Sequence, residues 1–327
     1  MKFLLVGSAT LDVVALAKKV RKVSLLHDEH VEKFACIAFA SKTVLDDVVV
    51  SPGGSPANSA VTIKRLGGTP TLVSGVGGDL FGKIILSSLK EQGVNTKGVK
   101  VFKKEKSSLG VILVDESGEK SVLTFKGAVD SLSEKDCPDS LVKNADVVVL
   151  CSLASRKNFS LFKKIIVKAK KFKKKLVFAP SITMLRERHS ELGRYHPHFD
   201  LVVMNLEEAF YYTGERTVKG AFRKLGARTA VITCDKQGSY AFDGKNVFHV
   251  NAPHVSVVDT TGAGDAFTGA FVHSFFENKD LKKALQEATA VAGLKISSLG
   301  ARFKGGKKEV RDFIKKHHFA LYVRKVV

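Results

Sequence analysis

The chain has 327 residues, of which 44% are hydrophobic, so it is long enough to bury a large core. No apolar run approaches the roughly 18 residues that a transmembrane helix needs, which argues against a membrane-spanning protein. Lys and Arg (53) outnumber Asp and Glu (32), which leaves a formal charge of +21, and the four cysteines are widely spaced. We therefore expect a cytoplasmic globular protein with free thiols that attracts anionic ligands.

Short apolar runs alternate with helical patterns along most of the chain. Near-continuous hydrophobic character is typical of parallel strands that are covered on both faces. This alternation predicts a doubly wound α/β fold, in which helices cover both faces of the sheet. The predicted strands are 3–6, 71–74, 147–151, 176–179, 201–204 and 230–233, and the predicted helices include 58–66, 83–92 and 159–171.

Two segments interrupt this alternation. Residues 34–50 and 110–125 have the pattern of β-strands, and the second segment turns at Asp115-Glu-Ser-Gly118. We interpret both as parts of a small β-sheet that projects from the main sheet and covers a cleft. No long linker or repeat divides the chain, so residues 1–327 are expected to form one domain.

Much of the positive charge lies between Lys163 and Lys175. Apolar residues such as Phe162, Ile165 and Ile166 recur there at helical spacing, so the lysines form the solvated face of an amphipathic helix. The alternative is a non-catalytic ligand sensor or a nucleic-acid-binding protein. No aromatic-interleaved RNA motif or zinc-finger spacing supports that alternative, so we do not expect nucleic acid as a partner.

The segment Asp259-Thr-Thr-Gly-Ala-Gly-Asp265 follows an apolar run and opens a helical pattern. Glycines let the backbone approach a ligand closely, and the N-terminal end of a helix favours an anion such as a phosphoryl group. Asp265 in the first helical turn has two interpretations: a general base that takes a proton from an attacking hydroxyl, or a cap of the helix. The residues alone leave both open.

A second glycine-rich segment, residues 52–58, also leads into a helical pattern. Asn58 offers donors and an acceptor to vicinal hydroxyl groups, and Asp12, shortly after the first predicted strand, is placed to accept hydrogen bonds from the same sugar. Both positions suit the ends of strands, where open α/β sheets bind ligands. The alternative is a simple turn with Asn58 near a helix start.

Three further patterns resemble known sites. Gly77 to Lys83 has the spacing of a P-loop, but Ile84 replaces the Ser or Thr that binds Mg²⁺, so we interpret it as a turn before a helix. Asn205 and Glu208 follow a predicted strand and either organise Mg²⁺ through water or cap a helix. Two histidine pairs lack further ligands and are interpreted as surface loops: His27 with His30, and His196 with His198.

Taken in chain order, these segments resemble the ribokinase-like (PfkB) carbohydrate kinase family over nearly the whole chain. The matching motifs are Val258 to Phe267 for the C-terminal signature, Gly53-Gly54-x-x-Ala57-Asn58 for the N-terminal signature, Val76 to Gly82 for the segment after it, and Asn205-x-x-Glu208 for the Mg²⁺ and phosphate motif.

The resemblance implies a ribokinase-like fold and an ATP-dependent kinase that phosphorylates a primary hydroxyl of a sugar. A nucleoside is the alternative acceptor, because the apolar residues Phe34, Ile37 and Phe39 of the projecting sheet are candidates to stack on a base. That sheet would be a lid over the substrate and the interface of a homodimer.

The resemblance also implies a role for each matching residue. Asp265 would be the base, with Gly262, Ala263 and Gly264 binding the phosphoryl group. Asp12, Gly54 and Asn58 would bind the substrate, and Thr233, Asp235 and Gly238 the nucleotide. Asn205 and Glu208 would hold Mg²⁺ through water, and Asp259 would bind K⁺ or another monovalent cation.

The chain departs from the residues that are usual in the family at three places. Asp235 replaces the first glycine of the usual Thr-x-Gly-x-x-Gly, and Ser55 stands where true ribokinases carry a lysine. Cys151-Ser152-Leu153 stands where true ribokinases carry a glutamate at the end of a central strand. We therefore expect a kinase that is not ribokinase itself, with altered contacts to the phosphate donor.

Overall fold

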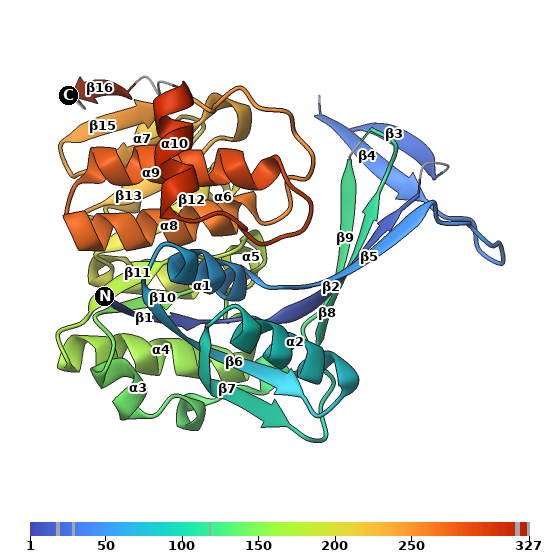
Figure 1. The fold of residues 1–327 in the computed structure, drawn as a ribbon, viewed down its shortest axis with the longest axis horizontal. Coiled ribbons are helices and arrows are strands. Elements are labelled where there is room, and N and C mark those ends of the chain that lie inside the picture. Colours follow the sequence, from blue (N-terminus) through green and yellow to red (C-terminus); the bar gives the residue numbers. More distant parts are fainter. Residues whose placement is uncertain (18–19, 28–29, 118, 318–320, 326–327) are drawn as a thin grey trace.

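The computed structural model describes residues 1–17, 20–27, 30–117, 119–317 and 321–325, and within them a large central sheet has ten strands (Figure 1). Seven neighbouring strands, from β13 at one end to β7 at the other, run parallel to one another. The remaining strands β14, β15 and β16 continue the sheet beyond β13, each antiparallel to its neighbour. In spatial order the strands are β16 (Leu321–Lys325), β15 (Asn246–Val250), β14 (Ser239–Phe242), β13 (Ala230–Thr233), β12 (Leu201–Asn205), β11 (Lys175–Phe178), β10 (Val147–Leu150), β1 (Lys2–Val6), β6 (Thr69–Gly77) and β7 (Asn95–Phe102).

Helices cover both faces of this sheet, as the doubly wound fold requires. One face carries α1 (Ser55–Arg65), α2 (Leu80–Glu91), α8 (Ala263–Asn278), α9 (Leu281–Ile296) and α10 (Lys307–His317). The other carries α3 (Asp139–Lys143), α4 (Arg156–Lys171), α5 (Ile182–Leu192), α6 (Leu206–Thr213) and α7 (Val218–Leu225). Short 3₁₀ helices lie at Gly127–Ser131, Glu134–Asp136, Gly193–His198 and Asp235–Gln237.

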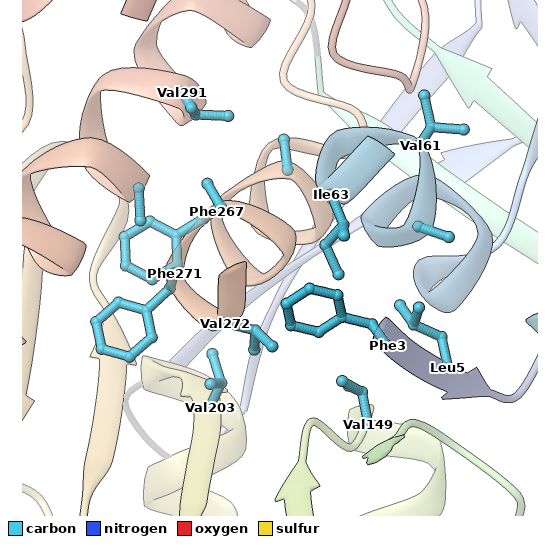
Figure 2. Packing of buried hydrophobic residues seen from close by; sticks show 14 of the residues in the cluster. Phe3, Leu5, Val61, Ile63, Val149, Val203, Phe267, Phe271, Val272 and Val291 are labelled. Atoms are coloured by element: carbon cyan, nitrogen blue, oxygen red, sulfur yellow. The ribbon is translucent and has the colours of Figure 1, made fainter. Parts of the chain in front are cut away.

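Each face of the sheet has its own hydrophobic core. Successive side chains of a strand point to opposite faces, so Phe3 and Leu5 of β1 join the core under α1 and α8, whereas Leu4 and Val6 join the core under α4. Figure 2 shows Phe3 packed between α1 and α8. Among the described helices, none combines the length and the hydropathy that crossing a bilayer demands.

A small four-stranded sheet projects from the body (Figure 1), and its order is β5 (Asp47–Gly53), β2 (Thr10–Leu16), β8 (Ser108–Val114) and β9 (Lys120–Phe125). We call these four strands the lid sheet. A separate hairpin of β3 (Arg21–His27) and β4 (His30–Cys36) lies at its outer end.

The lid sheet confirms one predicted segment and corrects the other. Residues 110–125 include the predicted hairpin, whose turn is closed by the Asp115 N–H donating to the Glu119 carbonyl oxygen (3.1 Å); Gly118 lies outside the described residues. The prediction for 34–50 was only partly right, because 37–46 contain no strand. The centre of the lid sheet is formed instead by β2, whose backbone pairs with β5 on one side and with β8 on the other.

Two sequence patterns outside the proposed site have structural roles. The Gly82 N–H of the P-loop-like segment donates to Asp79 Oδ1 (2.8 Å), so Asp79 caps the N-terminal end of α2. His196 was expected in a surface loop but is buried and stacks on Tyr212, with 4.8 Å between ring centroids. The backbones of His27 and His30 pair in the β3–β4 hairpin, so these residues belong to strands.

The amphipathic pattern of α4 yields a stability test. Ile166 is 2% exposed and packs in the core, whereas its neighbour Val167 is 61% exposed. Ile166→Ala should lower the free energy of unfolding by about 2–5 kcal/mol, because it leaves a cavity. Val167→Ala should change it by less than about 0.5 kcal/mol. Urea unfolding followed by circular dichroism measures both, and equal losses would contradict the assigned helix face.

Candidate active site

Asp265 lies in the first turn of α8, at the third residue of the helix. Gly262 precedes the helix with φ +74°, a left-handed conformation that favours glycine. A side chain there would also collide, because a Cβ atom on residue 262 would lie 1.9 Å from the Ala301 carbonyl oxygen. Gly262 therefore sets the tight turn that starts α8 and positions Asp265.

The Asp265 carboxylate is bound by α1 and not by its own helix. Asn58 Nδ2 donates to Asp265 Oδ2 (2.8 Å), and the Ser55 hydroxyl is a further hydrogen-bond partner. Burial raises the pKa of Asp265, against the opposing effects of these hydrogen bonds and of the Lys295 charge. The carboxylate therefore hydrogen-bonds to α1, although its charge still lies in the first turn of α8.

A cavity of about 130 Å³ adjoins Asp265 at the carboxyl ends of β10 to β13. These ends lie beside the point where the strand order reverses, with β6 on one side of β1 and β10 on the other. Residues from the motifs meet in this cavity although they are distant in sequence. Its lining includes Ser55, Asn205, Glu208, Thr233, Gly264 and Asp265.

Asp12 lies on the lid strand β2. Burial is the main cause that raises the pKa of Asp12, and Asp265 is close enough for its negative charge to raise this pKa further. Thr10 Oγ1 donates to Asp12 Oδ1 (2.9 Å). A Cβ atom on Gly53 would lie 2.0 Å from Asp12 Oδ2, so the first glycine of the Gly53-Gly54 pair makes room for this carboxylate. Gly54 is the N-cap of α1.

Asn58 is buried and uses both ends of its amide within the site. Its Nδ2 atom donates to Asp265, and its Oδ1 atom accepts from Arg302 Nε (3.4 Å). Arg302 also donates to Ser88 Oγ (2.7 Å), and burial lowers its pKa to about 10. The sequence motifs did not include Arg302, which no local spacing connects with Asn58.

Asn205 and Glu208 form a capping box at the start of α6. Asn205 Oδ1 accepts from the Glu208 N–H (2.8 Å), and Glu208 Oε2 accepts from the Asn205 N–H (2.9 Å). Burial raises the pKa of Glu208 to about 7, and the negative charges of Glu207 and Asp265 contribute. Asn205 and Glu208 therefore cap α6. The Glu208 carboxylate also lines the cavity, close to the negative charges of Glu207 and Asp265, which a cation would compensate.

The expected nucleotide residues lie at the end of β13 and in the turn after it. Thr233 lines the cavity, whereas Asp235 is exposed in the 3₁₀ turn and Gly238 is buried behind it. Asp235 has φ +44°, so it occupies the left-handed conformation for which the family uses glycine. Aspartate tolerates this conformation better than most residues do, which explains how the turn survives the substitution.

The residues from Asp259 to Thr261 form a tightly bound loop before α8. Asp259 Oδ1 accepts from the Thr261 N–H (2.9 Å), and Asp259 Oδ2 accepts from the Gly300 N–H (3.0 Å). Burial alone would raise the pKa of Asp259, but hydrogen bonds from Thr261 and Lys120 and the charge of Lys295 lower it to about 2.

Two lysines that the motifs did not reveal contact this loop. Lys120, the first residue of β9 in the lid sheet, lies 3.1 Å from Asp259 Oδ1 and donates to Thr261 Oγ1 (2.6 Å). Lys295 of α9 donates to the Asp259 carbonyl oxygen (2.6 Å). The one feature of the sequence that could have indicated a buried role for Lys295 is its position in an otherwise apolar stretch.

The three expected phosphoryl-binding residues differ in their surroundings. The Ala263 N–H donates to the Thr260 carbonyl oxygen (3.2 Å), so the turn itself uses it. Gly264 is exposed and lines the cavity. Gly262 packs against Ala301.

Known proteins resemble this chain over most of its length. A family model described as pfkB family carbohydrate kinase matches residues 10–306. The chain is 30% identical to ribokinase from Bacillus subtilis over 91% of this chain and 93% of that protein. It is 29% identical to ATP-dependent 6-phosphofructokinase from Thermoanaerobacterium thermosaccharolyticum over 76% of this chain and 80% of that protein.

The fold also matches solved structures. A putative ribokinase II from E. coli, in its apo form, superposes with a TM-score of 0.83, covers 97% of this chain and 99% of its own, and is 24% identical. At that identity the likeness supports the ribokinase-like fold alone. Since the family match covers residues 10–306, which include the lid sheet and the Asp265 loop, the chain belongs to the pfkB family of carbohydrate kinases.

Proposed function

We propose that this kinase transfers the γ-phosphoryl group of ATP to a primary hydroxyl group of a sugar, with Asp265 as the base. The observation that carries the proposal is the Asp265 carboxylate itself, held by Asn58 beside a cavity, with a pKa raised by burial. A raised pKa makes the carboxylate a stronger proton acceptor whenever it is ionised.

The proposed reaction is an in-line displacement. Asp265 accepts the hydroxyl proton as the sugar oxygen bonds to the γ-phosphorus of ATP, and the bond from that phosphorus to the bridging oxygen breaks to release ADP. Asp12, Gly54 and Asn58 are proposed to hold the sugar, since Asp12 and Asn58 are close to Asp265. Gly264, which is exposed at the start of α8, and the α8 dipole are proposed to favour the charge of the transferred group.

Mg²⁺ fits the residues at the start of α6. The half-buried Glu208 carboxylate has a pKa raised by burial and by negative neighbours, so a divalent cation would compensate a local excess of negative charge. Asn205 and Glu208 would hold the ion through water. When bound, Mg²⁺ neutralises charge on the ATP phosphates. Thr233, Asp235 and Gly238 are proposed to lie along the nucleotide.

A sugar acceptor is favoured over a nucleoside. The nucleoside alternative relied on aromatic and apolar residues of the segment 34–39. Phe39 is fully exposed, and Phe34 lines a different cavity, which is bounded by β3, β4, β8 and β9 residues such as Lys22 and Leu113. Neither ring lines the cavity beside Asp265, but Asp12, Gly54 and Asn58 do not line it either, so this cavity does not discriminate between the acceptors. The relatives named ribokinase favour the sugar.

We further propose that residues 1–327 act as one kinase domain that forms a homodimer through the lid sheet. The outer strands β5 and β9 expose apolar side chains that a monomer would leave in water, including Val48, Val49, Val50, Val122, Leu123 and Phe125. All four cysteines are free, which supports a location in the reducing cytoplasm.

Asp265→Asn should lower kcat by about 10²–10⁴-fold, because the amide cannot accept the proton. The free energy of unfolding should not fall, because the neutral amide avoids a buried charge. A coupled ADP-release assay across a panel of sugars and nucleosides measures the rate and identifies the acceptor. Asp280→Asn, at the N-cap of α9, is the matched control and should retain the wild-type rate. A normal rate for Asp265→Asn would exclude this residue as the base.

The Mg²⁺ requirement should depend on pH through Glu208. Since its pKa is about 7, the carboxylate is mostly ionised at pH 8 and mostly protonated at pH 6. The Mg²⁺ concentration for half-maximal activity should therefore rise about tenfold from pH 8 to pH 6, beyond the change due to ATP itself. Glu208→Gln preserves the capping box and should need more Mg²⁺ at pH 8, with only the pH dependence of ATP remaining. Identical pH profiles for the two proteins would contradict this role.

Leu123→Asp should convert the dimer into a monomer, because a charge at the centre of an apolar interface has no partner there. Sedimentation velocity at micromolar protein concentration measures the change. Val167→Asp places the same charge on an equally exposed apolar residue of α4 and should leave the dimer intact. A monomeric wild-type chain would refute the interface.

A further inference from the structure

Lys295 is a fully buried lysine, with 0% of its surface exposed. It lies near the C-terminal end of α9, and its Nζ atom donates to the Asp259 carbonyl oxygen (2.6 Å). The Asp259 Oδ2 atom is 3.8 Å away. A buried ammonium group is unfavourable unless an opposite charge and hydrogen-bond acceptors surround it, and Asp259 supplies both.

This contact bears on the monovalent cation that the family resemblance places at Asp259. Such a cation needs oxygen ligands, and the Asp259 carbonyl oxygen already accepts from Lys295. Asp259 Oδ1 binds Lys120 and the Thr261 N–H, and Asp259 Oδ2 binds the Gly300 N–H. A metal ion at these oxygens would also lie beside two ammonium groups of the same charge. The residues around Asp259 therefore do not fit a monovalent metal ion.

The Lys295 ammonium has the properties that the cation would otherwise supply. Burial lowers the pKa of Lys295 to about 8, and the Asp259 charge opposes this shift, so the group is mostly a positively charged ammonium at pH 7. The core around α9 holds the side chain in place. The carbonyl oxygen that it binds belongs to the residue that starts the Asp259–Thr261 loop, which leads directly into Gly262 and Asp265. The charge therefore acts on the loop that positions the base.

We propose that the Lys295 ammonium replaces the monovalent cation, so that the enzyme carries its own cation and works at full rate without K⁺. Lys295 is thus a positioning residue: it holds the Asp259–Thr261 loop and touches no reacting atom. The rate part of this inference rests on the proposed role of Asp265, whereas the binding part concerns only Asp259 and its neighbours.

The first test needs no variant. Wild-type kcat should be the same in potassium chloride and in choline chloride at equal ionic strength. The melting temperature should also be the same in the two salts. The melting temperature does not depend on catalysis, so it tests the inference even if ADP release shows that the proposed function is wrong. An activation by K⁺ of several-fold, or a melting temperature raised by K⁺ over choline, would overturn the proposal.

Lys295→Ala should create a K⁺-dependent protein. Removing the ammonium frees the Asp259 carbonyl oxygen and leaves space beside it, so kcat in choline chloride should fall by at least about tenfold. K⁺ or ammonium chloride should restore much of the rate and raise the melting temperature, because the ion binds the folded state. A wild-type rate in choline chloride, or an absence of any K⁺ effect on both rate and melting temperature, would contradict the proposal.

Two further variants separate the charge from packing. Lys295→Met keeps an apolar stem in the space and removes only the charge, so it should lose rate in choline chloride and gain little from K⁺. If Lys295→Ala does not fold, this variant still tests the charge, and an undiminished rate would refute its role. Lys168→Met is the matched control: Lys168 is another buried lysine, which donates to the Cys137 carbonyl oxygen (2.6 Å) on the opposite face of the sheet, and its loss should not change kcat or the response to K⁺.

Discussion

The hydrogen bond between Asn58 and Asp265 joins two helices that come from opposite ends of the chain. A second bond, from Ser59 Oγ to the Asp265 carbonyl oxygen (2.9 Å), links the same turns of α1 and α8. Both helices pack on the same face of the sheet, over Phe3 of the central strand β1 (Figure 2). The position of the Asp265 carboxylate therefore depends on the core beneath α1 and α8. The position of the Asp259–Thr261 loop, which leads into α8, depends on the same packing.

Electrostatics then distinguishes the two carboxylates of one short segment. Burial raises the pKa of Asp265, whereas Lys120, Lys295 and the Thr261 hydrogen bonds lower the pKa of Asp259 to about 2. Asp259 stays ionised and organises the loop, while Asp265 keeps a stronger affinity for a proton. Two aspartates six residues apart thereby differ in their affinity for a proton, because their neighbours differ.

The main sheet was predictable from sequence because its central strands are buried on both faces and read as continuous apolar runs. Predicted strand 230–233 coincides with β13, and 3–6 is one residue shorter than β1. The lid was harder to predict. β9 was recognised although it exposes all six of its residues, and the first four residues of β5, which are all exposed, lay within the predicted segment 34–50. β2 was not predicted. β2 follows β1 after a short turn and acquires its strand partners only from distant segments.

Sequence by itself determined the motifs in which the chemistry is contiguous: the Asp259 to Asp265 segment, the Gly53-Gly54 turn before Asn58, and Asn205 with Glu208. In each, backbone geometry over a few residues fixes the arrangement, so local spacing carries the information. Only the tertiary structure decided that Lys295, Lys120 and Arg302 join them, because their partners lie on other helices and strands. Whether a lysine's charge faces solvent or a buried carbonyl oxygen depends on how helices pack, and no local pattern encodes that choice.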